Sequence, residues 1–260
     1  MISNETQQKI VETLLGHSNV DGFTLWQLGL FAIGFLFWTL AYIHIAIDGK
    51  RDSINEMPML AAAGNIAWEI LWAFVLKSDL GLLFQVCCFC WFFVDIFINY
   101  QIITKNYKII TEPFIRKNYR LIHFFFFTVF MFVLYFMAEE GKDNGLGVES
   151  GLLLNLFMSG LYLYQMFQDP RFRGKAYSLK VAIYKMLGTT LITISSAFIW
   201  PDDDYLISLG IATFVLDVVY VYLFITYKPV LMALQEHKEK NPGVQFDFFK
   251  KHHELKNAKA

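Results

Sequence analysis

The chain contains few of the residues that build disulfide scaffolds or metal centres. Cys87, Cys88 and Cys90 are the only cysteines among 260 residues, and they crowd one apolar stretch. Neighbouring residues on a helix point in different directions, so these thiols favour a packing role over a disulfide framework or a metal cage. The net charge of −1 gives no indication of a nucleic-acid partner.

The sequence also lacks the short motifs of many soluble enzymes. It has no glycine-rich phosphate loop, no serine-centred nucleophile elbow and no HExxH zinc motif. No glycine- or proline-rich repeat divides it into separate domains. Residues 1–22 have no basic head followed by an apolar core, so we expect no cleavable signal peptide there. Their weak apolar stripe fits either a short interfacial helix or a frayed terminus.

Long hydrophobic runs dominate the rest of the sequence. The chain is 56% hydrophobic and 18% aromatic. A transmembrane helix needs about 20 mostly apolar residues. We therefore predict an all-α membrane protein, a single bundle of seven transmembrane helices over 23–227, followed by a basic tail at 228–260. The predicted spans are 23–47, 57–76, 80–103, 121–138, 149–168, 178–199 and 205–227.

Lysine and arginine are unevenly distributed between the two predicted faces. The first, third and fifth connections and the tail hold most of them. The opposite face has only Lys9, Lys77 and Lys142, together with acidic patches. Because basic loops stay in the cytoplasm, this predicts an outside N-terminus and a cytoplasmic C-terminus. We expect a multi-pass protein of the bacterial plasma membrane or the endoplasmic reticulum.

Two carboxyl groups lie deep inside predicted spans. Glu69 is in 57–76 and Asp217 is in 205–227. An ionised carboxyl at the bilayer centre costs roughly 3 kcal/mol or more, so such residues usually serve a function. At 1.5 Å per residue, they lie about 18 Å and about 15 Å from the inner ends of their helices. Because their depths are similar, the two acids can flank one cavity. They are the two candidate catalytic residues.

Helical spacing groups other polar and aromatic residues with these acids. Asn65, Trp68 and Trp72 share a face with Glu69, where an amide can bind the carboxyl and indoles can stabilise a cation. In an alternative reading, Asn65 and Glu69 only hydrogen-bond a neighbouring helix. Tyr220 shares a face with Asp217.

Other buried polar residues have two possible roles. Asp95 shares a face with Trp91, and Lys185 is the only basic residue well inside a span, so we expect an Asp95–Lys185 ion pair. Asn155, Ser159 and Tyr162 line one side of the fifth span and either orient a substrate or join helices. Asp202–Asp204 resembles a metal-diphosphate motif, but acids beside Pro201 are more typical of a solvated helix start. We expect no metal and no cofactor.

Several motifs in this order resemble one known family. Met57-Pro58, Asn65, Trp68 and Glu69 resemble the second-helix signature of the integral-membrane terpene cyclases of fungal meroterpenoid and indole-diterpene pathways, the pyripyropene and paxilline types. Residues of helices 3, 5, 6 and 7 agree in order: Trp91, Asp95, Asn155, Ser159, Ser178, Ala182, Lys185, Gly188, Thr189 and Asp217. One departure is Ala176-Tyr177 before Ser178, where the family tends to carry Gly-Gln.

This resemblance implies an enzyme that cyclises a prenyl chain by protonation, without metal. The family acts on farnesyl or geranylgeranyl chains attached to an aromatic or polyketide head, often with a terminal epoxide. The counterparts of Glu69 and Asp217 are its acidic catalytic residues. We expect Glu69 to protonate an epoxide or an alkene, with Asp217 assisting or taking the final proton. The expected substrate contacts are Asn65, Trp68, Trp72, Trp91, Asp95, Asn155, Ser159, Tyr162, Lys185 and Tyr220.

Rival functions remain open at this stage. A small proton-coupled transporter would titrate Glu69 and Asp217 during transport, although neither an internal repeat nor a broken helix is visible. A retinal receptor would need a Schiff-base lysine in the seventh span, which has none. The expected partners are a prenylated molecule drawn from the bilayer and the lipid itself.

Overall fold

The computed structural model describes residues 3, 6, 9, 24–52, 54–79, 81–143, 145, 147–168, 177–240, 254 and 257. Within this part of the chain every regular element is helical. The elements in chain order are α2 (Leu25–Arg51), α3 (Met59–Ile70), the π-helical η1 (Leu71–Val75), α4 (Gly81–Lys105), the 3₁₀ turn η2 (Asn106–Ile109), α5 (Pro113–Glu139), α6 (Val148–Gln168), α7 (Leu179–Ile199) and α8 (Asp204–Lys240).

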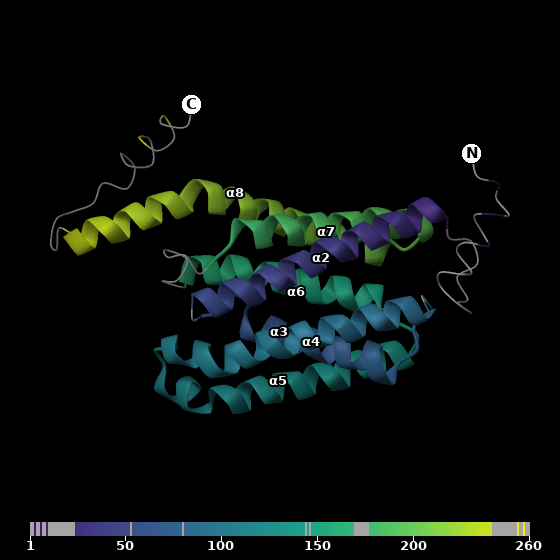
Figure 1. The fold of residues 1–260 in the computed structure, drawn as a ribbon, viewed down its shortest axis with the longest axis horizontal. Helices are drawn as coiled ribbons and strands as arrows, with labels where there is room; N and C mark the ends of the chain where they lie inside the picture. Colours follow the sequence, from purple (N-terminus) through teal and green to yellow (C-terminus); the bar gives the residue numbers. More distant parts are fainter. Residues whose placement is uncertain are drawn as a thin grey trace.

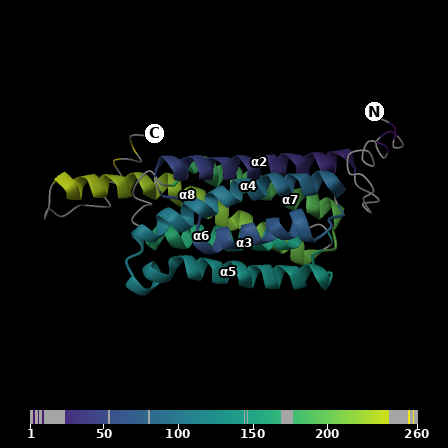
Figure 2. The same ribbon diagram turned by 60° about the horizontal axis from the view of Figure 1, so that its bottom comes forward.

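The helices lie side by side as one elongated bundle (Figure 1). α2 packs along α7, which lies beside α8, and α6 also packs on α8. α3 packs against α4 and α5, and α5 forms an outer edge of the bundle (Figure 2). The predicted all-α class is confirmed.

The outer surface of the bundle is strongly apolar. On α5, Phe124, Phe125 and Phe132 are each more than 60% exposed. Exposed apolar surface of this extent marks a lipid or protein contact. Among the described residues, five helices are long and apolar enough to cross a membrane, whereas the apolar helix at Met59–Val75 is shorter. Seven membrane crossings and the orientation of the termini therefore stay predictions.

Some predicted boundaries differ from the observed ones. α5 begins at Pro113, earlier than the predicted span at 121, because Glu112 caps it by accepting a hydrogen bond from the Ile115 amide. α8 continues through Pro229 to Lys240, beyond the predicted end at 227. The segment 1–22 lies outside the described residues, except for 3, 6 and 9, and the tail is described only as far as 240 and at 254 and 257.

α3 carries most of the residues that place the candidate site. Its small residues Ala61, Ala62, Ala63 and Gly64 are buried, so neighbouring helices approach it closely. A Cβ on Gly64 would lie only 2.7 Å from the Leu154 side chain of α6. Directly after Glu69 and Ile70 the helix changes to the wider π form. Such turns occur frequently at functional sites.

Candidate active site

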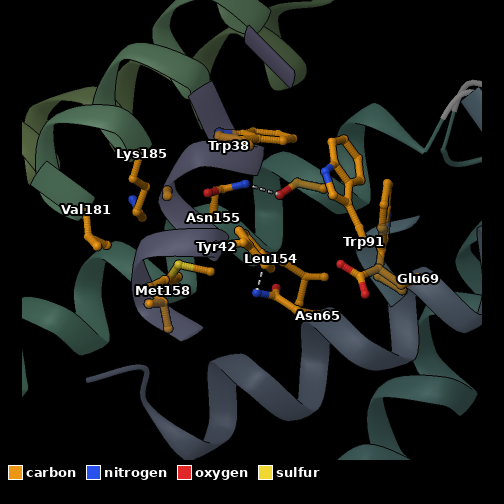
Figure 3. A pocket seen from close by; sticks show the side chains of 14 residues that line it. Trp38, Tyr42, Asn65, Glu69, Trp91, Leu154, Asn155, Met158, Val181 and Lys185 are labelled. Carbon is orange, nitrogen blue, oxygen red and sulfur yellow. Dashed lines mark hydrogen bonds between the residues drawn. The ribbon is translucent and has the colours of Figure 1, made fainter. Parts of the chain in front are cut away.

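Two small cavities adjoin inside the bundle. The first, which we call the Glu69 cavity, has a volume of about 40 Å³ (Figure 3). The second, the Asp217 cavity, has a volume of about 10 Å³. Val181 and Lys185 line both, so these two residues of α7 form the boundary. The expectation that Glu69 and Asp217 flank a single cavity is therefore wrong, because each acid lines its own chamber.

Glu69 projects from α3 into the first cavity, with Asp95 of α4 beside it. Glu69 is 3% exposed and Asp95 is fully buried. The two carboxyls are close enough to interact electrostatically. No donor among the described residues reaches either carboxyl oxygen of Asp95 or Oε2 of Glu69. Two neighbouring buried carboxyls without another donor resist double ionisation, so the arrangement fits a pair that holds one proton.

Three indole rings line the Glu69 cavity. Each ring N–H is engaged elsewhere: Trp38 donates to Thr189 Oγ1 at 3.2 Å, Trp68 to Ser150 Oγ at 2.8 Å, and Trp91 to Thr39 Oγ1 at 2.7 Å. In this conformation the bound N–H groups hold the rings in place, with their apolar surfaces at the cavity. Such surfaces can stabilise a cation without competing as hydrogen-bond donors.

Amides complete the polar lining of this cavity. Asn65 donates to the hydroxyl of Tyr42 at 2.5 Å. Asn155 donates to the Gly151 carbonyl at 3.0 Å and also lines the cavity. The sequence-based candidates Asn65, Trp68, Trp91 and Asn155 thus meet at one place.

Trp72 lines neither cavity. It is 2% exposed and belongs to the apolar core, where its ring packs beside that of Trp68 with the centroids 6.3 Å apart. Helical spacing groups it with Trp68 and Glu69, but of the two indoles only that of Trp68 reaches the Glu69 cavity. Gly147, with a φ of +71°, supports this position, because a Cβ there would approach the Trp72 ring at 2.6 Å.

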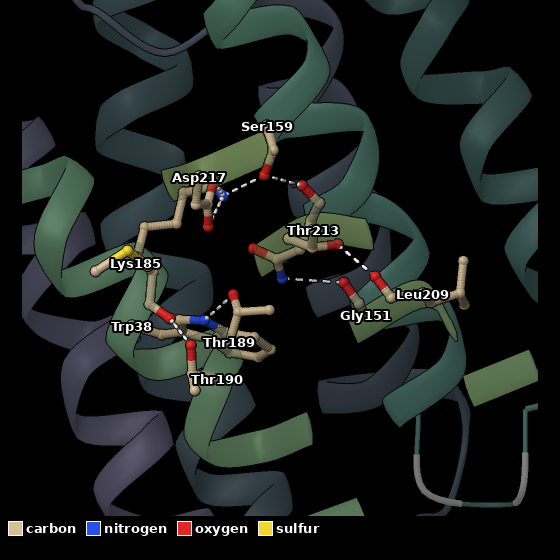
Figure 4. A network of polar contacts seen from close by, with 11 residues as sticks. Trp38, Gly151, Ser159, Lys185, Thr189, Thr190, Leu209, Thr213 and Asp217 are labelled. Carbon is tan, nitrogen blue, oxygen red and sulfur yellow. Dashed lines mark hydrogen bonds and ion pairs between the residues drawn. The ribbon is translucent and has the colours of Figure 1, made fainter. Parts of the chain in front are cut away.

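Lys185 pairs with Asp217 rather than with Asp95. Its Nζ donates to the two carboxylate oxygens of Asp217 at 2.6 and 2.9 Å, and also to Ser159 (Figure 4). Both partners are less than 10% exposed. The predicted Asp95–Lys185 pair is wrong, because α7 packs on α8, which carries Asp217, whereas Asp95 on α4 lies beside α3. Ser159 in turn donates to the Asn155 carbonyl at 2.8 Å.

The Asp217 cavity gathers three further polar groups. The hydroxyls of Tyr162 and Tyr220 and Oε1 of Glu56 line it without a hydrogen-bond partner among the described residues. Glu56 Oε2 accepts a hydrogen bond from the Ser178 amide at 2.9 Å. Burial raises the pKa of Glu56 to about 8, and this hydrogen bond opposes the rise only in part. The cavity has room for about one water molecule.

Several residues of the two cavities were absent from the sequence-based candidates. These are mainly Trp38 and Tyr42 of α2 and Glu56 of the α2–α3 connection. Trp38 and Tyr42 share a face with Ile45 by i, i+4, i+7 spacing, a signal that the sequence does contain. Glu56 directly precedes Met57-Pro58.

Asp203 accepts a hydrogen bond from the Leu206 amide at 2.9 Å, so it caps α8 in the manner expected of a helix start.

Comparison of the sequence with known proteins shows which proteins the chain is similar to. The chain is 26% identical over 185 residues to the terpene cyclase cle7 of Aspergillus versicolor, covering 67% of this chain and 73% of that protein. It is 36% identical over 74 residues to the Pyr4-family terpene cyclase mfmH of Annulohypoxylon moriforme, or 30% of that protein. A third match is 46% identical over 43 residues to the terpene cyclase ascF of Acremonium egyptiacum, or 16% of that protein.

No solved structure matches the chain. The model of one family, described as Pyr4-like transmembrane terpene cyclases, matches residues 23–229. This range includes all the residues that line the two cavities. The chain therefore belongs to the Pyr4-like transmembrane terpene cyclase family.

Proposed function

We propose that the protein cyclises a prenylated substrate by protonating the terminal epoxide or alkene of its prenyl chain. The substrate would carry a farnesyl or geranylgeranyl chain on a meroterpenoid head group, and the reaction would need no metal. The observation that carries this proposal is the Glu69–Asp95 carboxyl pair at the wall of a cavity with three indole rings. The relatives named terpene cyclases support the same reaction class.

Glu69 is the proposed general acid. Two adjacent carboxyls in an apolar interior resist double ionisation, so the pair retains a proton. Glu69 lines the cavity, whereas Asp95 lies behind it. In the first step the Glu69 proton moves to the epoxide oxygen while a C–O bond breaks. The electron-deficient carbon is then attacked by the next alkene of the chain, and each attack moves the cation forward. Loss of a proton from the last cation gives a neutral isomer of the substrate.

The cavity walls would protect and guide the cation. Cation–π attraction to a desolvated ring contributes up to ~2 kcal/mol. Trp38, Trp68 and Trp91 have their N–H groups bound elsewhere, so their rings suit this role. Exclusion of water from the apolar lining prevents early capture of the cation.

Asp217 is the proposed acceptor of the final proton. It forms a buried ion pair with Lys185, with Nζ 2.6 Å from Oδ1, and an ion-paired carboxylate suits a base and not an initiating acid. Lys185 lies at the boundary of the two chambers, where it can orient the substrate head group or a cyclised intermediate. Ser159 holds Lys185, and Tyr162 and Tyr220 offer hydroxyls to a polar group in the second chamber.

The test is an assay of membranes that contain the protein. Farnesyl and geranylgeranyl phenols, each with and without a terminal epoxide, would be incubated and analysed by chromatography with mass detection. We expect a product of unchanged mass and altered retention from at least one epoxide. Absence of any isomer, combined with proton-dependent flux in liposomes, would instead support the transporter alternative.

A further inference from the structure

The Glu69 cavity is far too small for the proposed substrate. Its volume is about 40 Å³, whereas sites for small molecules are typically about 300–1,000 Å³. A much larger apolar groove of about 620 Å³ lies between α2 and α4. Its lining includes Gly29, Ala32, Phe35, Val86 and Cys90. Ala32, Val86 and Cys90 are exposed, so the groove opens on the outside of the bundle, where lipid is expected.

A single side chain belongs to both the groove and the Glu69 cavity. The Trp91 indole lines each of them. Thr39, another groove residue, accepts the hydrogen bond from its ring N–H at 2.7 Å. Phe35 meets the Trp91 ring edge-on, with ring centroids 5.4 Å apart. The Trp91 ring, held by a hydrogen bond and an aromatic contact, therefore lies between the groove and the space that Glu69 faces.

We propose that the α2–α4 groove receives the prenyl chain of the substrate from the bilayer. Trp91 would then act as the partition that moves to bring the reactive end of the chain to Glu69. This inference rests on the proposed cyclase function. The groove volume lies in the range of ligand sites, and its lining is almost entirely apolar, as a hydrocarbon chain requires. The groove adjoins the cavity that holds the carboxyl pair, which favours a prenyl substrate over a membrane lipid, because a saturated acyl chain has no group for an acid to protonate.

Gly29 offers a direct way to fill the groove. A Cβ at this position would meet no atom within 4 Å, so a larger side chain extends into open space. We expect Gly29→Phe to lower kcat/KM at least tenfold, mainly through KM, a reduction typical of a changed pocket contact. Gly160→Phe on α6 is the matched control, because Gly160 also has no atom within 4 Å of a Cβ and lines none of the three spaces. Wild-type kinetics for Gly29→Phe, or equal loss in both variants, would overturn the proposal.

Photo-crosslinking tests occupancy without requiring turnover. The probe is a geranylgeranyl phenol with a diazirine on the prenyl chain, compared with a phosphatidylcholine that carries the diazirine on an acyl chain. We expect the prenyl probe to label peptides from 25–39 and 84–94, and unlabelled geranylgeranyl phenol to compete. Equal labelling by the lipid probe without such competition would identify a lipid site and overturn the proposal. Groove labelling in a protein that makes no isomer would contradict the cyclase function and leave the groove assignment intact.

Discussion

At the scale of single residues, the chemistry depends on which partner each buried charge has. Asp217 has a cation, Lys185, at 2.6 Å. Asp95 has a second carboxyl, that of Glu69. A cation stabilises a carboxylate, whereas a neighbouring carboxyl favours a retained proton. In the proposed mechanism, Asp217 is therefore the base and Glu69 the proton donor.

Asp95 is a positioning residue for Glu69 in this account. In Asp95→Asn, the new amide would donate a hydrogen bond to Glu69 and favour its ionised form, which cannot protonate the substrate. We expect kcat to fall by about 10²–10⁴, the usual contribution of a general acid, with an unchanged melting temperature. Asp202→Asn, at an exposed loop position, is the control. Full activity of Asp95→Asn, measured by product formation, would exclude the shared proton.

The Lys185–Asp217 pair gives a second prediction at this scale. Lys185→Met leaves a buried carboxylate without its partner, which typically costs about 3–5 kcal/mol. We expect a clear loss of thermal stability in detergent and recovery of much of it in the double variant Lys185→Met/Asp217→Leu, without recovery of activity. If Lys185→Met alone is as stable as wild type, the ion pair does not stabilise the fold.

The sequence identified the acids themselves but not their partners. A charge within an apolar run is visible in any sequence, which is why Glu69, Asp217, Asp95 and Lys185 were all recognised. Pairing depends on how each helix is rotated and which helix it packs against. Lys185 was assigned to Asp95 because both were placed nearer the cytoplasmic side, whereas contact between α7 and α8 gives it Asp217.

At the scale of the elements, the tight packing of α2 on α7 positions Trp38. A Cβ on Gly188 would lie 2.3 Å from the Trp38 ring and 2.9 Å from the Gly34 carbonyl. In the same way, a Cβ added to Gly34 would lie 3.1 Å from the Gly188 carbonyl oxygen. Small residues at such crossings are typical of membrane helices.

Gly188→Ala should therefore separate α2 from α7. We expect a loss of about 1–3 kcal/mol in stability from overpacking, together with reduced cyclisation because the Trp38 ring is displaced. Gly160→Ala, at an open position, should be neutral or slightly stabilising. Thermal unfolding of both variants in the same detergent makes the comparison. Equal stability of Gly188→Ala and wild type would show that this crossing tolerates a methyl group.

The helices were predictable as elements, while their irregularities were not. Apolar runs of about 20 residues identify helices by composition alone. The π turn at Leu71–Val75 leaves no such mark. Trp72, which lies within it, packs in the core beside Trp68 and not at the cavity wall. The early start of α5 did have a signal, Glu112 followed by Pro113, which an analysis based on apolar runs passes over.

At the scale of the whole molecule, global stability should depend on pH through Glu56. Its folded-state pKa of about 8 exceeds the ordinary value of 4.5 because burial disfavours the charged form. Between these values the folded state binds more protons than the unfolded state, so stability falls as pH rises from about 4.5 to about 8.

Glu56→Gln should remove this dependence. We expect wild type to lose about 4 kcal/mol between the two ends of that range, and the variant to change much less. Melting temperatures in detergent at pH 5 and pH 8.5 provide the comparison. Parallel behaviour of the two proteins would show that Glu56 titrates normally in the folded state.

In the proposed mechanism, the bundle has separate places for proton donation and proton removal. An apolar substrate would reach them from the surrounding lipid, and the apolar walls would exclude water from the reaction. The arrangement of Glu69, Asp95, Lys185 and Asp217 is the feature on which this account depends.

The most direct test of the central claim is the product formed by Glu69→Gln. Membranes with wild type, Glu69→Gln and the exposed control Glu140→Gln would be given the best epoxide substrate at equal amounts of folded protein. We predict an isomeric product from wild type and Glu140→Gln and none from Glu69→Gln, because the glutamine amide is far too weak an acid to protonate the epoxide. An active Glu69→Gln variant would contradict the assignment of Glu69 as the initiating acid.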